Sequence, residues 1–236
     1  MKKISVGFLV FNENDSIKQT ILRAHSSLKR FSNDFEIWVF DNNSSDGSSQ
    51  TVEDLCNAID ELVLFKQNKN IGYAQNLNSA IRKMSAEYIF VIDGDGQYDV
   101  DDIQSSIKLL EKNDVIFGIR RPRQDPILRI LMSYFLGILS KIILGSNLKD
   151  INCGFRGFKY EASKKIKINF NYNFVGPEVF TLSKLNKLKI CEMRIKHYKR
   201  ISGISYFNGF FKIILSCVTM IKYLFQLRKI LKKNQI

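Results

Sequence analysis

The chain has 236 residues, 45% of them hydrophobic and 25% charged, which suits one α/β domain and excludes a disordered protein. Its net charge of +13 is uneven, because residues 1–118 sum to −6 and residues 119–236 to +19. The acidic first half and the lack of any nucleic-acid-binding motif argue against a nucleic-acid partner. The basic second half indicates an anionic partner, such as a phosphorylated substrate or a phospholipid surface.

The amino-terminal segment and the cysteines indicate a cytosolic protein. The four cysteines show neither CxxC pairing nor metal-ligand spacing, which indicates reduced thiols. After the apolar run at 4–11 the chain continues with Asn12-Glu13-Asn14-Asp15, where a signal peptide needs small residues for cleavage. The run is therefore predicted to be a first β-strand.

Strand-like and helix-like segments alternate through the first half. Strands are predicted at 4–10, 36–40, 62–66, 88–92 and 115–119, and helices at about 15–31, 49–59, 71–84 and 101–112. Such alternation predicts βαβ units and a mostly parallel sheet flanked by helices. Ligands of these sheets gather at the carboxyl ends of the strands, so the polar residues after each strand are the first candidates for a site.

The second half contains more apolar helix. A helix is predicted at 127–144, a strand at 154–160, a helix at 177–188, a strand at 190–197 and a last helix from about 205. The last helix is amphipathic, and ten basic but no acidic residues follow Glu192. We expect it to attach to an anionic membrane surface, with a core helix or a homo-oligomer seam as alternatives. Residues 127–144 are a second candidate for the same surface.

A pair of carboxylates directly follows the predicted strand at 88–92, in the segment Asp93-Gly94-Asp95-Gly96-Gln97. Two carboxylates so spaced on an extended segment can both reach one Mg²⁺ or Mn²⁺, an ion that also bridges substrate phosphates. A solvated acidic turn is the simpler interpretation. Asp41, at the end of the second strand, suits hydrogen bonding to a ribose or base, although for this residue taken by itself an Asx-turn is the favoured interpretation.

Four motifs occur in a fixed order and together resemble the nucleotide-binding half of family 2 glycosyltransferases. They are Val10-Phe11-Asn12-Glu13, the turn 41–47, Asn70-Ile71-Gly72-Tyr73-Ala74 and the segment 93–97. The segments 150–158 and 200–205 resemble those of the dolichyl-phosphate mannosyltransferase and bacterial polyprenyl-phosphate glycosyltransferase branch. Prolines common in the family are absent near Val10 and Val100 and in the Glu192–Ile195 segment.

The resemblance implies a GT-A, Rossmann-like fold and a set of site residues. It implies that Mg²⁺ or Mn²⁺ is held by Asp93, Asp95 and Gln97, and that the nucleotide is bound by Phe11, Glu13, Asp41 and Asp93. Asp95, Arg120 and Arg200 are the implied catalytic residues. Contacts with phosphate or acceptor are implied for Arg129, Arg156 and Ser205, since the planar guanidinium meets phosphate through two hydrogen bonds.

The implied activity is inverting, metal-dependent transfer of a sugar from a nucleotide-sugar donor to polyprenyl phosphate, at the cytoplasmic face of a membrane. Residues 1–120 would be the donor-binding half, 121–205 the acceptor-binding half and 206–236 a membrane-associating tail. The alternative is a family 2 enzyme that extends a saccharide of a capsule or other surface glycan. That reaction needs a general base, for which Glu178 and Asp150 are the candidates.

Overall fold

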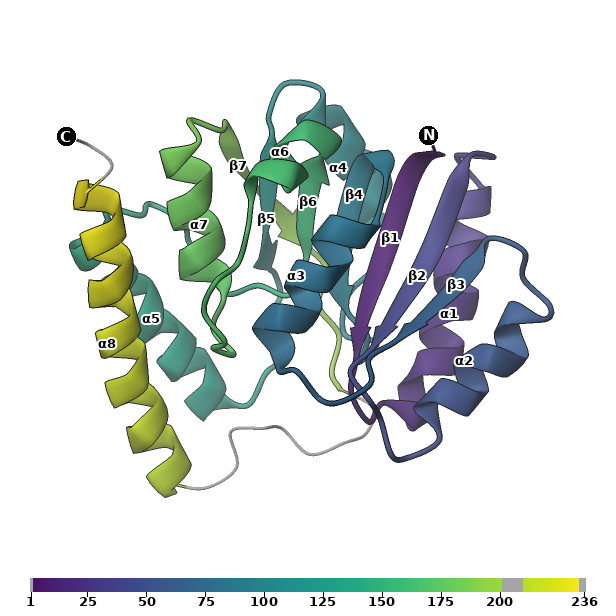
Figure 1. Ribbon diagram of the computed structural model, residues 1–236, viewed down its shortest axis with the longest axis horizontal. Coiled ribbons are helices and arrows are strands. Elements are labelled where there is room, and N and C mark those ends of the chain that lie inside the picture. Colours follow the sequence, from purple (N-terminus) through teal and green to yellow (C-terminus); the bar gives the residue numbers. More distant parts are fainter. Residues whose placement is uncertain (1, 201–209, 234–236) are drawn as a thin grey trace.

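The computed structural model describes residues 2–200 and 210–233, and these form one seven-stranded sheet with helices on both faces (Figure 1). The strand order is β3-β2-β1-β4-β6-β5-β7. The strands are β1 (Lys2–Val10), β2 (Phe35–Asp41), β3 (Leu62–Lys66), β4 (Ala86–Asp93), β5 (Val115–Arg120), β6 (Arg156–Lys159) and β7 (Ile190–Ile195).

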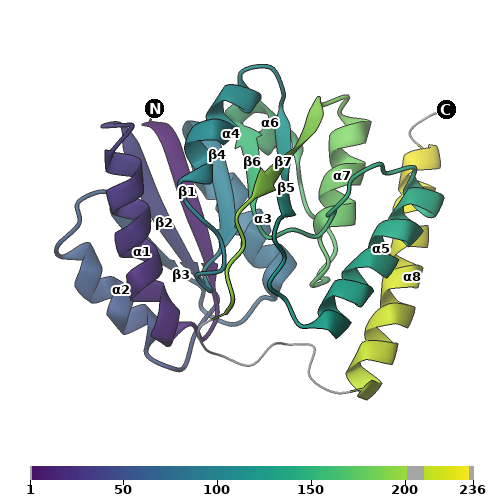
Figure 2. The same cartoon turned by 180° about the vertical axis from the view of Figure 1, so that it is seen from behind.

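The helices form a layer on each side of the sheet. Figure 1 shows α3 (Tyr73–Lys83), α6 (Tyr160–Lys165) and α7 (Gly176–Leu185) on the near face. Figure 2 shows α1 (Asn14–Lys29) and α4 (Asp102–Leu110) on the other, with α2 (Ser48–Cys56) near its β3 edge. The remaining helices, α5 (Ile127–Leu144) and α8 (Phe210–Lys233), lie side by side at the end of the molecule away from β3.

Each face of the sheet has its own hydrophobic core, which explains why the strands are continuous apolar runs. In β4, Phe90 and Ile92 pack with α1 and α4, whereas Ile89 and Val91 pack with α3, α7 and α8. A strand buried on both faces gains from apolar residues at every position, as in parallel sheets covered by helices. The predicted mostly parallel α/β architecture is observed.

The strand β6 departs from the expected pattern in direction and length. It lies antiparallel between β4 and β5, with Phe90 opposite Gly157 and Phe117 opposite Arg156. It covers less than the predicted 154–160, because residues 154 and 155 leave the sheet and Tyr160 begins the short helix α6, which sequence periodicity did not predict. A helix of six residues is too short to show a helical repeat. Since β6 pairs with both β4 and β5, the two predicted halves share one sheet.

The described part of α8 uses its apolar face within the protein. Met220, Tyr223, Leu224, Leu227 and Leu231 are buried in the core shared with α5 and α7. We expected this face to lie on a membrane, with Met220 and Leu224 among its members. For these residues that expectation is wrong, because packing against the domain covers them; the amphipathic pattern here is that of a core helix.

Candidate functional site

The candidate site lies at the carboxyl edge of β1 and β4, where the two strands are neighbours. Leu9 of β1 is in register with Asp93 of β4, and the Gly94 amide donates a 2.9 Å hydrogen bond to the Leu9 carbonyl. A Cβ atom on Gly94 would lie 2.6 Å from Cγ2 of Val10, so only glycine lets the chain cross the end of β1 this closely. This crossing brings Asp95 near Glu13, which follows β1.

Carboxylates gather around the guanidinium of Arg200. Arg200 forms an ion pair with Glu13, and its Nη1 lies 3.4 Å from Oδ2 of Asp95. Burial raises the pKa of Glu13 to about 7, with Arg200 opposing the shift and Asp95 and Asp93 adding to it. Burial, and then the charge of Asp93, raise the pKa of Asp95 to about 6. The raised values indicate that Arg200 alone does not neutralise the cluster.

This cluster suits a hard divalent cation. Carboxylate oxygens are the ligands of Mg²⁺ and Mn²⁺, and one or two of them suffice when substrate phosphates complete the coordination. Among residues 2–200 and 210–233, no three His, Cys, Asp or Glu side chains surround a common point. Asp93 and Asp95 therefore fit a cation shared with a bound diphosphate better than one enclosed by protein.

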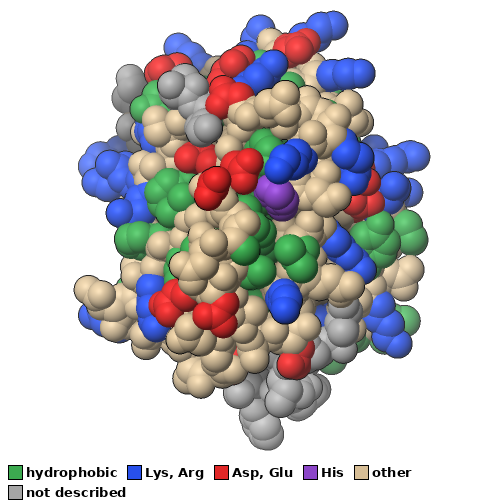
Figure 3. Space-filling view, turned by 90° about the vertical axis from the view of Figure 1, so that its right-hand side faces the viewer, with side chains coloured by type: hydrophobic (Ala, Val, Ile, Leu, Met, Phe, Trp, Pro, Cys, Tyr) green, Lys and Arg blue, Asp and Glu red, His purple; other side chains and the backbone are tan. Residues whose placement is uncertain are grey.

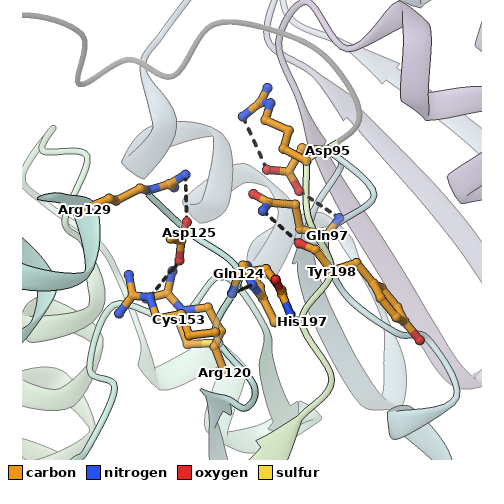
Figure 4. A network of polar contacts seen from close by, with 12 residues as sticks. Asp95, Gln97, Arg120, Gln124, Asp125, Arg129, Cys153, His197 and Tyr198 are labelled. Carbon is orange, nitrogen blue, oxygen red and sulfur yellow. Dashed lines mark hydrogen bonds and ion pairs between the residues drawn. The ribbon is translucent and has the colours of Figure 1, made fainter. Parts of the chain in front are cut away.

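Gln97 connects the Asp95 turn to the chain that carries Arg200. Its side-chain Nε2 donates a 3.0 Å hydrogen bond to the backbone carbonyl of Tyr198, and its backbone carbonyl accepts one of 2.8 Å from the backbone amide of Tyr198. The backbone amide of Gln97 donates to Oδ1 of Asp95 (Figure 4). The amide group of Gln97 thus positions residue 198 next to the cluster. Its expected role as a metal ligand stays a prediction.

The carboxylate of Asp93 is positioned by contacts that the sequence analysis did not predict. The Tyr73 hydroxyl donates to Oδ1 of Asp93 at 2.7 Å, and Nη1 of Arg156 lies 3.4 Å from the same hydroxyl. A Cβ atom on Gly154 would lie 2.0 Å from Oδ2 of Asp93. Arg156 is 1% exposed and supports Asp93 through Tyr73, so it does not present the open phosphate contact that we expected. Tyr73 lies in the 70–74 motif, the one signal that could have identified it.

The carboxylate of Asp41 accepts hydrogen bonds from the turn that follows β2 and from α2. It is fully buried, and it accepts hydrogen bonds from the Ser44 amide at 3.1 Å and from the hydroxyls of Ser44 and Ser49. The turn interpretation therefore describes this structure, in place of the expected open contact with a nucleotide. Phe11, at the end of β1, is 46% exposed and remains available to a ligand.

Arg120, one of the implied catalytic residues, forms hydrogen bonds with two carboxylates. Its Nε and Nη2 each donate to Asp150 at 2.7 Å, and its Nη1 donates to Asp125 at 3.1 Å. Arg120 is 6% exposed, so in place of the open guanidinium that a catalytic role implies it forms buried ion pairs. Asp125 also pairs with Arg129 at 3.2 Å, and Figure 4 shows Arg129 reaching it from the α5 side. Arg129 is the more accessible of the two arginines.

The two candidate general bases, Asp150 and Glu178, both form hydrogen bonds with other groups of the protein. Although burial opposes the shift, the hydrogen bonds and charge of Arg120 lower the pKa of Asp150. Glu178 is 1% exposed and accepts hydrogen bonds from the amides of Asn169 and Phe170 and from the Tyr223 hydroxyl. Neither carboxylate is free to take a proton from an acceptor. Ser205 lies outside the described residues.

Comparison with known proteins gives one family and one group of relatives. The sequence profile of glycosyl transferase family 2 matches residues 5–167. The chain is 26% identical over 158 residues to the undecaprenyl-phosphate 4-deoxy-4-formamido-L-arabinose transferase of Pseudomonas fluorescens, covering 66% of this chain and 46% of that protein. The Proteus mirabilis enzyme of the same name is 24% identical over 228 residues, which cover 93% of this chain and 68% of that enzyme. The chain thus spans about half the length of most of the curated relatives that it matches.

The solved structures that match support the fold. Glucosyl-3-phosphoglycerate synthase from Mycobacterium tuberculosis, in complex with Mn²⁺, UDP-glucose and phosphoglyceric acid, has a TM-score of 0.68 at 14% identity and covers 94% of this chain and 80% of that one. The same protein in complex with UDP gives a TM-score of 0.69 at 15% identity, and the match covers 97% of this chain and 80% of that one. These likenesses confirm the predicted fold class.

Proposed function

The chain belongs to glycosyl transferase family 2 and has its GT-A fold, and on this basis we propose that it transfers a sugar from a nucleoside diphosphate to polyprenyl phosphate. The observation that carries the proposal is the placement of Glu13 and Asp95 beside Arg200, with Asp93 two residues before Asp95, at the carboxyl edge of β1 and β4. These carboxylates would favour a bound cation, and a metal-bound diphosphate is a donor that supplies one.

The donor side rests on Asp93 and Asp95. The two carboxylates would hold Mg²⁺ or Mn²⁺, which offsets the negative charge that develops on the departing nucleoside diphosphate. The structural neighbour crystallised with Mn²⁺ and UDP-glucose supports this choice of ion and donor class. Tyr73 and Gly154 fix the carboxylate of Asp93 before any ligand arrives, which reduces the entropy lost on binding.

The acceptor side rests on the engagement of both candidate general bases, Asp150 and Glu178, by other groups of the protein. The oxygen of a phosphate monoester is ionised at neutral pH, so it can attack the anomeric carbon without losing a proton. Asp150 and Glu178, the carboxylates that a hydroxyl acceptor would need, are bound to Arg120 and to the 169–170 amides. Relatives named undecaprenyl-phosphate transferases support the same acceptor class.

In the proposed reaction the acceptor oxygen bonds to the anomeric carbon as the bond from that carbon to the diphosphate breaks. The attack comes from the side opposite the leaving group, which inverts the configuration. Two negatively charged substrates must approach each other, so cationic side chains have to offset their repulsion. We assign this role to Arg200, which contacts Asp95, and to the partly exposed Arg129 at the start of α5.

The proposal is tested by incubating the protein with radiolabelled UDP-, GDP- or TDP-sugars, Mn²⁺ and a short-chain polyprenyl phosphate. We expect one donor to give a labelled product that partitions into organic solvent and is lost when EDTA is added. A parallel reaction with oligosaccharide acceptors provides the comparison. Transfer only to the oligosaccharides would contradict the proposed acceptor and support the glycan-extending alternative.

A further inference from the structure

The outward face of α5 is apolar along its whole length. It carries seven large apolar residues that are 40–77% exposed, and Lys141 is its one exposed charge (they are Ile127, Leu128, Leu131, Tyr134, Phe135, Ile138 and Ile142). At 100° per residue these positions fall on one side of the helix. A single exposed leucine needs no explanation, but a contiguous stripe of this kind marks an interaction surface.

The helix α5 is apolar on both sides, unlike an ordinary surface helix. Its inward side places Leu136, Ile143 and Leu144 in the core, together with Ser140, whose buried hydroxyl has no hydrogen-bond partner among the described residues. An amphipathic helix that only covers a core places its apolar residues inward. Here 22% of this apolar helix is buried, so most of its hydrophobic surface is not used by the domain. The sequence of α5 therefore fits an apolar environment outside the protein.

The charges around the stripe favour one kind of partner. Neither α5 nor α8 contains an acidic residue. The outward side of α8 adds two apolar residues, Val218 and Phe225, and several exposed lysines, namely Lys222, Lys229, Lys232 and Lys233. Figure 3 shows that the opposite end of the molecule, with α1 and α2, mixes acidic and basic side chains. The α5/α8 end thus combines an apolar stripe with exposed positive charge.

We propose that the outward face of α5, flanked by the lysines of α8, docks on an anionic lipid bilayer. Apolar side chains would enter the acyl boundary while the lysines meet the headgroups, as in interfacial helices. A second copy of the chain fits less well, because a twofold contact places each patch against itself and would bring lysines together without acidic partners. The sequence-based expectation placed attachment on the apolar face of the last helix, of which Met220 and Leu224 are buried in the domain.

The docked orientation brings the site to the membrane. The stripe begins at Ile127, two residues after Asp125, which joins Arg120 and Arg129 in the site. Figures 1 and 2 show α5 starting at the same edge of the molecule as the carboxyl ends of β1 and β4. A phosphate carried by a membrane lipid would thus arrive near Arg129. This orientation rests on the proposed function, whereas the docking itself rests on the surface.

Flotation with vesicles tests the proposal. We expect the protein to float with phosphatidylcholine–phosphatidylglycerol vesicles, and the triple variant Leu131→Gln, Ile138→Gln, Ile142→Gln to bind at least about tenfold more weakly. Glutamine keeps the helix propensity high. Leu131→Gln alone should weaken binding, while Leu22→Gln, at an exposed leucine of α1, is the matched control and should float normally. Replacing Lys229, Lys232 and Lys233 by glutamine should lower the preference for phosphatidylglycerol by about fivefold for each lysine.

Each contrary result has a defined meaning. Absence of flotation by the unaltered protein, or undiminished flotation of the triple variant with a normal melting temperature, would refute docking through α5. A dimer in sedimentation that the triple variant converts to monomer, without vesicle binding by either, would assign the face to a second copy. Transfer to a short-chain, water-soluble acceptor needs no vesicle, so failure of the proposed reaction is measured separately from failure of docking.

Discussion

The hydroxyl of Tyr73 donates a 2.7 Å hydrogen bond to Oδ1 of Asp93, joining the first turn of α3 to the end of β4. On the other side of the hydroxyl lies Nη1 of the buried Arg156, at 3.4 Å. Burial and the neighbouring charge of Asp93 raise the pKa of Tyr73. The phenol is therefore a permanent donor that orients the carboxylate toward the site.

Tyr73→Phe should weaken the binding of Mn²⁺ with a nucleotide by about tenfold, because a hydrogen bond to a charged group contributes about 1.5–3 kcal/mol. The affinity is measured by titration calorimetry and by electron paramagnetic resonance of free Mn²⁺. Tyr134→Phe, at an exposed tyrosine of α5, is the control. Equal affinities of the two variants would show that Tyr73 does not position Asp93.

Asp95→Asn should abolish cation-dependent nucleotide binding while the protein stays folded. The change removes a ligand charge from the cluster and leaves the buried position filled by a side chain of the same shape. Thermal shift with UDP or GDP and Mn²⁺, with and without EDTA, provides the measurement. Binding that persists in Asp95→Asn and ignores EDTA would refute the metal assignment.

Arg120→Met should lower the free energy of unfolding by about 3–5 kcal/mol, because it removes both guanidinium hydrogen bonds to the buried Asp150 and leaves it Arg123, whose Nη1 lies 4.0 Å away. Arg30→Met removes the partner of Asp101 in an ion pair whose side chains are both more than half exposed, and should cost about 1 kcal/mol or less. Urea denaturation of both variants gives the comparison. Similar losses would show that the Arg120 network contributes no more than a surface pair.

Stability should fall in acid because of His197. Burial, together with Arg120, Arg123 and Arg129, lowers the pKa of His197 from 6.5 to about 4 in spite of Asp125, and its Nδ1 accepts a hydrogen bond from the Gln124 amide. Between these values His197 binds a proton in the unfolded chain but not in the folded chain. Its contribution therefore makes folding less favourable as the pH falls from 6.5 to about 4, whereas Glu13 and Asp95, with their raised pKa values, contribute in the opposite direction.

His197→Gln should remove this part of the pH dependence when urea unfolding is measured at pH 7 and at pH 5. The same change at the other histidine, His25, retains His197 and should keep the slope of the unaltered protein. An unchanged slope in His197→Gln would mean that the ring is already protonated in the folded state.

Arg200→Ala should lose most sugar transfer, and Arg200→Lys should recover only part of it, because an ammonium group does not reproduce the guanidinium that meets both Glu13 and Asp95. Glu178→Gln should keep most of its turnover, since loss of a true general base costs about 10²–10⁴ in rate. Initial rates with short-chain polyprenyl phosphate provide the measurement. An indispensable Glu178 with an expendable Arg200 would favour a hydroxyl acceptor.

The sequence by itself determined the sheet, the helix α5 and the acidic edge of the site. The strands β1 to β5 were predictable because a strand buried on both faces is a continuous apolar run, and Ile127–Leu144 was predictable from its length and composition. Asp93 and Asp95 were identifiable because they directly follow such a strand, where ligands of parallel sheets bind.

Only the tertiary structure decided which charges are free and which apolar faces are covered. Arg120 is paired with Asp150, which lies 30 positions away in the sequence, and Asp41 accepts a hydrogen bond from Ser49. Arg120 and Asp41 therefore do not present the open contacts that their motifs suggested. The described part of α8 buries apolar residues in the core, while α5 carries apolar residues on both its inward and its outward side. Local periodicity fixes which side of a helix is apolar, but what covers that side depends on elements distant in sequence.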